Sequence, residues 1–312
     1  MKILIGCDGS GYMDVIRTDL REAGLPKEAE VIVLSVADVW LPEPWMPGLE
    51  AGMQVSLSAS VFEAVMNSGD MAKEEVQTAE GWAKEFAELL AQDFPKWSIR
   101  VEAYAASPAS AILDRAKSWQ ADLIVMGARG SSELERLLLG SVSSQVLAEA
   151  TCPIRISRPH RHKPTEGQRI LIGVDGSDTA LQTVTAVAQR SWNVGTEACL
   201  VVAIDESLST APRSVFSLFN DDNTAREEAE LEARIEDLLE QEIGKLALAG
   251  IRATSLTTRG KPGYVLMEEA EQWQADMIFV GAQGVRGHEN SRLGRVARAI
   301  AERSPITVEI VR

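Results

Sequence analysis

Short apolar runs alternate with stretches of helical periodicity along the chain. Ile3–Cys7 predicts a buried strand, and Met13–Ala23 follows with helical spacing that stops at Gly24. Further strands are predicted at 31–36, 99–105, 123–126 and 154–157, and further helices at 71–92, 109–119 and 141–150. Strict alternation is typical of a parallel sheet covered by helices on both faces, so the pattern predicts a doubly wound α/β fold.

The same order of elements occurs twice. Lys2–Ser10 returns 167 residues later as Arg169–Ser177, whereas Ser118–Ala128 returns after only 154 residues as Gln272–Ala282. Self-similarity of this kind indicates an internal repeat. The shorter second offset means that the first copy carries an insertion between the two blocks, and we place it in the unmatched stretch 42–69.

Prolines and charges without apolar periodicity fill the segment between the copies, which predicts a linker at 159–168. We therefore predict two tandem domains, 1–158 and 169–312, each with a five-stranded, Rossmann-like parallel sheet. The last strand of the second domain is predicted at 306–311.

Composition and charge exclude several classes of protein. The chain has 312 residues, of which 45% are hydrophobic and 25% charged, as in ordinary globular proteins. Its 31 Lys and Arg against 46 Asp and Glu give a formal charge of −15. Such a surface repels nucleic acid and anionic membranes, because both bind through clustered cations.

The cysteines and the first residues bear on location. Cys7, Cys152 and Cys199 are odd in number and far apart, which favours reduced thiols over a disulfide framework. No apolar run is long enough to span a bilayer. Met1 leads directly into a strand-like run without the features of a signal peptide, so we expect a cytoplasmic protein.

A glycine array follows the fourth strand. Gly127 and Gly130 let the backbone approach an anion without a Cβ in the way. Nine residues later, Gly140 and Ser141 open a helix whose free N–H groups attract phosphate, and the Ser141 and Ser143 hydroxyls add donors. A junction of strand and helix is where doubly wound sheets bind ligands. The alternative is that the glycines only form turns and that Ser141 only caps the helix.

Two charged residues are candidates for the same site as this array. Asp8, after the first strand, either positions Mg²⁺ on phosphates or only accepts hydrogen bonds from its Gly-Ser turn. Arg129, inside the loop, either pairs with a phosphate or is solvated. The sequence has no Walker P-loop and places no nucleophile beside a base, so we assign no catalytic residue and no protein-bound metal.

Together these motifs resemble the nucleotide-binding signature of the universal stress protein family. The resemblance covers both halves and rests on Gly127-x-x-Gly130-(nine residues)-Gly140-Ser141, Asp8-Gly9-Ser10, Ser107-Pro108 and Cys152-Pro153. It implies a tandem, nucleotide-dependent regulator of a stress response that binds ATP or AMP, with or without Mg²⁺. The implied nucleoside contacts are Asp8 and Val36, and the implied phosphate ligands are Gly127, Gly130, Gly140, Ser141, Val142 and Ser143.

The second half departs from this signature. It keeps its glycines but has Arg295 where the first half has Ser141, and over four residues three hydroxyls are lost and two cations gained. Arg295 either binds an anion or fills the phosphate site, so we treat this half as degenerate. Its counterpart positions are Asp175, Ile204, Gly281, Gly284, Gly294 and Arg295.

The resemblance also bears on assembly and on rival functions. Single-domain members pair through their last strands, which implies a pseudo-dimer through 154–157 and 306–311 and leaves a homodimer of whole chains open. One rival is a slow ATPase or adenylating enzyme, although Asp8-Gly9-Ser10-Gly11 differs from the Ser-Gly-Gly-x-Asp-Ser loop of adenylating enzymes. Another is a scaffold that uses the insertion, whose apolar run 61–66 forms a lid, a partner contact or a cover for the sheet edge.

Overall fold

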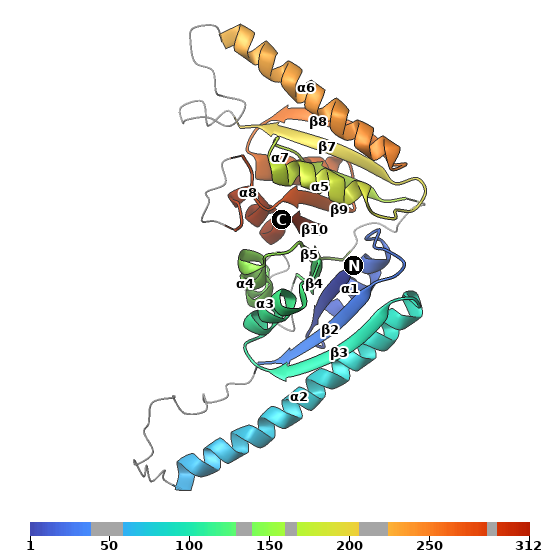
Figure 1. Ribbon diagram of the computed structural model, residues 1–312. Helices are drawn as coiled ribbons and strands as arrows, with labels where there is room; N and C mark the ends of the chain where they lie inside the picture. The colour runs from blue at the N-terminus through green and yellow to red at the C-terminus, as the bar shows by residue number, and fades with distance from the viewer. Residues whose placement is uncertain (39–58, 129–138, 160–166, 206–223, 286–291) are drawn as a thin grey trace.

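The computed structural model describes the backbone of residues 1–38, 59–128, 139–159, 167–205, 224–285 and 292–312 (Figure 1). In the two helices that begin at 59 and 224, side chains are described from 73 and 230 onward. The predicted alternation of strands and helices is confirmed in both halves.

In its described ranges, the first half comprises five strands and four helices. They are β1 (Lys2–Cys7), α1 (Tyr12–Arg21), β2 (Glu30–Ala37), α2 (Ala59–Asp93), β3 (Ser98–Ala105), α3 (Pro108–Trp119), β4 (Leu123–Gly127), α4 (Ser141–Glu149) and β5 (Ile154–Ser157). The second half repeats the order with β6 (Arg169–Gly173), α5 (Asp178–Ala188), β7 (Glu197–Ile204), α6 (Thr224–Leu248), β8 (Arg252–Arg259), α7 (Pro262–Gln272), β9 (Met277–Gly281), α8 (Arg295–Arg303) and β10 (Thr307–Val311).

All ten strands form one sheet, in the order β3-β2-β1-β4-β5-β10-β9-β6-β7-β8. Strands are parallel within each half, and the halves join where β5 pairs antiparallel with β10. The two predicted five-stranded sheets are therefore continuous, and the contact is the one between last strands that the resemblance implied.

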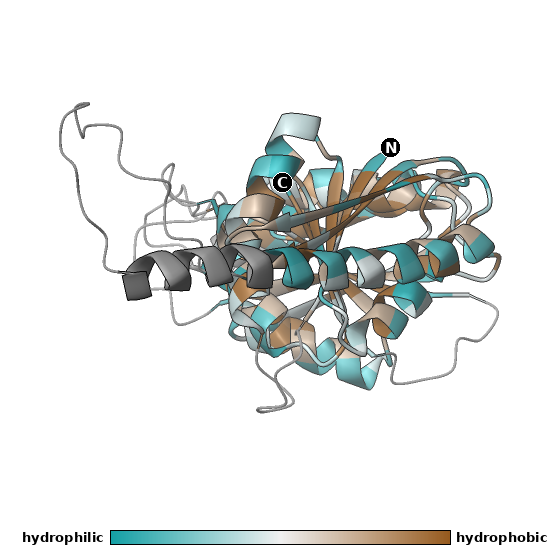
Figure 2. Ribbon diagram, turned by 90° about the horizontal axis from the view of Figure 1, so that it is seen from below, coloured by the Kyte–Doolittle hydropathy of each residue, from teal (hydrophilic) through white to brown (hydrophobic). Residues whose placement is uncertain are grey.

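Helices enclose the apolar strands on both faces, with hydrophilic residues turned outward (Figure 2). In each half the first two helices cover one face and pack over a core cluster of that half alone. The other face, under α3, α4, α7 and α8, is one cluster that runs through both halves. The two halves thus share part of their core. No helix in the described ranges is long and apolar enough to cross a bilayer.

The α2 helix begins earlier than predicted. We expected it at 71–92, but it starts at Ala59 and is 35 residues long, against 25 for α6. Ala, Glu and Met are good helix formers and no proline interrupts the sequence, so the helix extends into the predicted insertion. Most of the extra length between β2 and β3 therefore lies in a longer helix. The run 61–66 is helical, and residues 42–58 lie outside the described residues.

Candidate functional site

The strand order places the candidate site at the carboxyl ends of β1 and β4. The chain leaves β1 toward β2 on one side and returns from β3 to β4 on the other, so this edge is a topological switch point, where doubly wound sheets bind ligands. Asp8 follows β1 and Gly127 ends β4. Because Cys7 is level with Ser35 in the ladder, Val36 lies level with Asp8 on the neighbouring strand. The predicted residues Asp8, Val36 and Gly127 therefore lie at one edge of the sheet.

Asp8 is exposed and begins a tight turn. Its Oδ1 accepts the Ser10 amide at 3.1 Å, which confirms the hydrogen bond to the Gly-Ser turn that we considered. Among the described residues, nothing donates to Oδ2. Gly9 has φ +72°, and a Cβ there would lie 2.3 Å from the Trp82 ring, so α2 packs directly on this turn. We missed Trp82 in the sequence, where it resembled any other packing residue of an amphipathic helix.

The α4 helix begins beside the end of β4. The amide of Gly140, its N-cap, donates to the Ala128 carbonyl at 2.8 Å. The N-cap is Gly140, so the suggestion that Ser141 serves only as the cap is wrong: Ser141 is the first helical residue and is exposed. Within the part of the chain that the structure describes, no side chain accepts from the first-turn N–H groups, which lie at the positive end of the helix dipole.

Two residues of the first turn of α4 face the interior. The Ser143 hydroxyl is buried and donates to the Gly127 carbonyl at 2.9 Å, which fastens the start of α4 to the end of β4. Val142 is half-buried against the same core cluster as Val36. The role of Ser143 as a phosphate ligand stays a prediction. Arg129 and Gly130 lie outside the described residues.

In the second half the glycine loop is bonded to the turn after β6. Asp175 Oδ1 accepts from the amide and hydroxyl of Ser177, at 3.1 and 2.6 Å, and its Oδ2 accepts from the Val285 amide at 3.1 Å. The Thr179 hydroxyl donates to the Gln283 carbonyl. Both oxygens of the Asp175 carboxylate are therefore occupied by the protein itself.

Close approach requires glycine at two positions of this second loop. A Cβ on Gly284 would lie 2.4 Å from Asp175 Oδ2, and one on Gly281 would lie 2.6 Å from the Thr179 hydroxyl. Asp175, Gly281 and Gly284 are thus brought together as predicted. We missed Thr179, and the only signal for it was that Tyr12 occupies the same repeat position in the first half.

The α8 helix repeats the start of α4 without its hydroxyls. Gly294 is the N-cap, and its amide donates to the Ala282 carbonyl at 2.7 Å. Arg295 is exposed, and among the described residues its guanidinium makes no hydrogen bond or ion pair. Among the described residues no side chain caps this N-terminus either, but a cation stands at its first position.

Strand register corrects one predicted equivalence. We matched Ile204 with Val36, but the strand pairing shows that the counterpart of Val36 is Ala203. The two halves are aligned by Ile3 and Ile170, which share a repeat position. In that alignment, Val36 pairs with Tyr104 and Ala203 pairs with Thr258. Successive strand residues point to opposite faces. Ala203 accordingly packs on the same core cluster as Val36, whereas Ile204 packs on the cluster under α5 and α6.

The fold is that of a tandem, doubly wound α/β protein with a topological switch point at the carboxyl ends of β1 and β4. The family model of the universal stress protein family matches residues 1–158 and 167–312. The chain therefore belongs to the universal stress protein family.

The chain is similar to universal stress proteins of its own length and of shorter length, and its fold is similar to that of a solved member. A universal stress protein of Mycolicibacterium smegmatis is 26% identical over 99% of this chain and 96% of its own length. One of Methanocaldococcus jannaschii is 35% identical over 50% of this chain and 80% of its own length. The crystal structure of a universal stress protein from Archaeoglobus fulgidus covers 100% of this chain with 98% of its own, at a TM-score of 0.62 and 19% identity.

Proposed function

We propose that the first half binds an adenine nucleotide, ATP or AMP, and that the bound nucleotide regulates a stress response through partner binding or conformation. The observation that carries this proposal is the first turn of α4, which no described side chain caps, at the switch point that Asp8 also borders. Backbone N–H groups and the helix dipole favour phosphate at such a place. The phosphate contacts are Gly127, Gly140, Ser141, Val142 and Ser143, with Arg129 and Gly130 of the same glycine loop.

The nucleoside lies toward β2 in this proposal. Val36 offers a half-buried apolar contact for adenine on the face that α3 and α4 cover. Asp8 has one oxygen that accepts nothing from the described residues, and it suits a ribose hydroxyl or a Mg²⁺ ion held by the phosphates. The second half contributes less, because Asp175 is occupied by its own loop and Arg295 replaces the serine.

The test uses a matched pair of substitutions at the first residues of α4 and α8. Ser141→Asp and Arg295→Asp each place a carboxylate at an exposed first helical position, where negative charge does not destabilise a helix. Calorimetric titration with ATP and AMP, together with extraction of any nucleotide that co-purifies, measures affinity and stoichiometry.

We expect about one nucleotide per chain, weakened by about tenfold or more in Ser141→Asp and unchanged in Arg295→Asp. Two nucleotides per chain, with one lost in Arg295→Asp, would show that the second half binds as well. Absence of binding by the unmodified protein would refute the proposal and leave a scaffold role in its place.

A further inference from the structure

The two halves meet across an axis that relates equivalent residues. Arg155 of β5 and Glu309 of β10 occupy the same repeat position, 154 residues apart, and they are direct partners in the antiparallel ladder. Their side chains form an ion pair, with Arg155 Nη1 at 3.0 Å from Glu309 Oε2. Both are fully buried, or nearly so. In a pair of identical halves, the residue at this repeat position would face the same residue of the other half. In this chain, Arg155 faces a glutamate instead.

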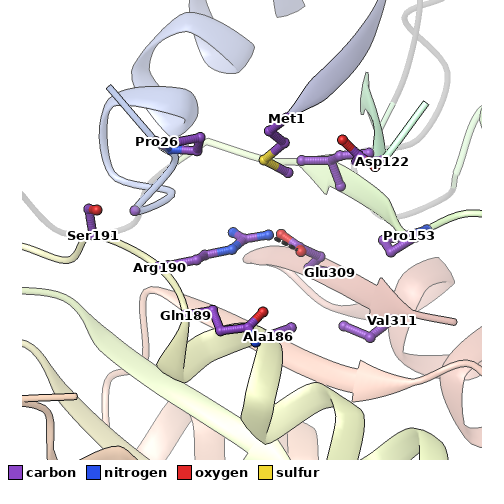
Figure 3. Close-up of a pocket in the computed structure, with 12 residues that line it drawn as sticks. Met1, Pro26, Asp122, Pro153, Ala186, Gln189, Arg190, Ser191, Glu309 and Val311 are labelled. Atoms are coloured by element: carbon purple, nitrogen blue, oxygen red, sulfur yellow. Dashed lines mark hydrogen bonds and ion pairs between the residues drawn. The ribbon is translucent and has the colours of Figure 1, made fainter. Parts of the chain in front are cut away.

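Each half also supplies a counter-ion for its own central residue. Arg155 donates to both carboxylate oxygens of Asp19 at 2.7 Å, and Glu309 accepts from Arg190. Asp19 and Arg190 do not share a repeat position, because their counterparts are Ala186 and Ala23. The order Asp19, Arg155, Glu309, Arg190 therefore alternates in sign across the junction, and the close-up shows Arg190 and Glu309 facing each other (Figure 3).

Hydroxyl groups complete the cluster from both sides. Asp19 accepts from Ser157 of its own half at 2.6 Å and from Thr307 of the other half at 3.0 Å. A cavity of about 270 Å³, lined in part by Arg190 and Glu309, lies beside the pair (Figure 3). Burial alone would lower the pKa of Arg155, but the Asp19 and Glu309 carboxylates outweigh it, so the pKa lies above its ordinary value.

A second set of contacts keeps the symmetry and carries no such preference. Arg158 donates to the Ala301 carbonyl at 2.5 Å, and Arg312, at the same repeat position, donates to the Leu147 carbonyl at 2.6 Å. Ala301 and Leu147 are themselves equivalent. Two identical halves would form contacts of this type equally well, so they add affinity without selecting a partner.

We propose that the charges of the axis residues make this surface selective: the last-strand surface of either half accepts the opposite half and rejects a second copy of itself. Two first halves would bring Arg155 against Arg155, and two second halves Glu309 against Glu309, at a buried position. Like charges at a buried contact lower the association constant by about 100-fold or more.

The selectivity is measured on the full chain with a protease site in the linker 159–168, cut after folding. Unlabelled and ¹⁵N-labelled nicked protein are mixed in urea concentrations that let the halves exchange, and native mass spectrometry counts the pairs. Pairs of one light and one heavy half report that exchange has occurred. We expect pairs of a first with a second half only, whereas random pairing would put about half of all pairs in the homotypic classes.

Variants show whether the charges are responsible. Asp19→Ala with Arg155→Met copies Ala186 and leaves an apolar residue on the axis, so first halves should now pair with one another. Glu309→Arg should weaken the nicked pair by about 100-fold or more, and Glu309→Gln, which keeps the size, by less. Glu197→Arg is the matched control, because Glu197 also faces an arginine, Arg252, on the next strand at 2.9 Å, but Arg252 is exposed and β9 and β6 lie between this pair and β10.

Three results would overturn the proposal. One is a near-random share of homotypic pairs in the unmodified nicked protein. Another is their continued absence in the Asp19→Ala, Arg155→Met variant, because something other than charge would then exclude them. The third is a Glu197→Arg variant that weakens the pair as much as Glu309→Arg, because the effect would then come from charge reversal in general.

Discussion

The two halves of this chain share the same order of strands and helices. They differ in the side chains at the turn after the first strand and at the start of the last helix. Among the described residues, Asp8 of the first half accepts one hydrogen bond, from its own turn, and α4 opens with an exposed serine; residues 129 and 131, the counterparts of Gln283 and Val285, lie outside them. In the second, Asp175 accepts three and holds the glycine loop, and α8 opens with an arginine. Equivalent glycines in the two halves therefore do not imply the same hydrogen bonds, because in the second half polar groups of the protein itself occupy both oxygens of the strand-end carboxylate.

The largest expected effect tests the junction on which both halves depend. Arg155→Ala should lower the free energy of unfolding by about 3–5 kcal/mol, since it leaves the Asp19 carboxylate buried without its cation. Urea unfolding followed by circular dichroism measures it. The control is Arg252→Ala, which removes an 81% exposed partner of an ion pair and should cost under about 1 kcal/mol. Equal losses in the two variants would contradict the importance of the buried cluster.

The next prediction compares the two strand-end carboxylates directly. Asp175→Ala should lower the free energy of unfolding by about 1–2 kcal/mol, because it releases Val285 and both donors of Ser177. Asp8→Ala should cost about 0.5 kcal/mol, for one lost hydrogen bond at an exposed turn. Thermal unfolding of the two variants without nucleotide gives the order. If Asp8→Ala costs more, the loop of the second half is not held by Asp175.

Acid should affect the first half more than the second. Hydrogen bonds from Arg17 and Arg21 to Asp93 join α1 to α2. They hold the pKa of Asp93 below its ordinary 3.8, and the bond from Arg17 lowers it most. The counterparts of the two arginines are Val184 and Ala188, so α5 has no such pair.

The stability that Asp93 adds is complete above about pH 3.8, its unfolded pKa, and is lost as the pH falls through the lower folded value. Amide exchange followed by mass spectrometry should therefore show α1 losing protection before α5 between pH 4 and 2. In Asp93→Asn the difference should vanish. Simultaneous loss in the unmodified protein would argue against the ion pair.

The smallest effect concerns the cysteines, whose modification should hardly occur in the folded protein. Burial raises the pKa of the Cys7 thiol to about 12 and that of Cys152 to about 11, and it also raises the pKa of Cys199. The reactive thiolate is therefore scarce at pH 8. Under conditions in which an alkylating reagent labels free cysteine completely, the mass of the folded protein should stay unchanged. In urea, all three cysteines should react. Rapid labelling of Cys7 would show that the turn after β1 opens.

Much of this structure is predictable from periodicity and self-similarity. Alternating runs give the elements, and the glycines locate the strand-to-helix junctions because only glycine permits the close approaches seen at Gly281 and Gly284. The predicted match of Ile204 to Val36 is wrong by one residue. Only the pairing of neighbouring strands determines which face of the sheet a strand residue points to.

The contacts of Trp82, Thr179 and Asp19 were not predictable in this way. Each depends on which helix or loop packs against a turn or a strand, and no local pattern encodes that. The charges of Arg155 and Glu309 do leave a trace in the sequence, because one repeat position carries opposite signs in the two copies. Sign reversals of this kind between aligned repeats are therefore a signal from which a junction can be predicted.

The pairing of β5 with β10 also determines how the protein is protected from aggregation. The outer edges of the described sheet are β3 and β8, whose residues are largely polar or exposed and make poor templates for added strands. The residues of β5 and β10 are all buried, and each strand would present an unpaired edge if the halves separated. Separation of β5 from β10 would thus expose one apolar, unpaired strand edge on each half, to which other chains could add. Conditions that separate the two halves should therefore be those in which the protein first precipitates.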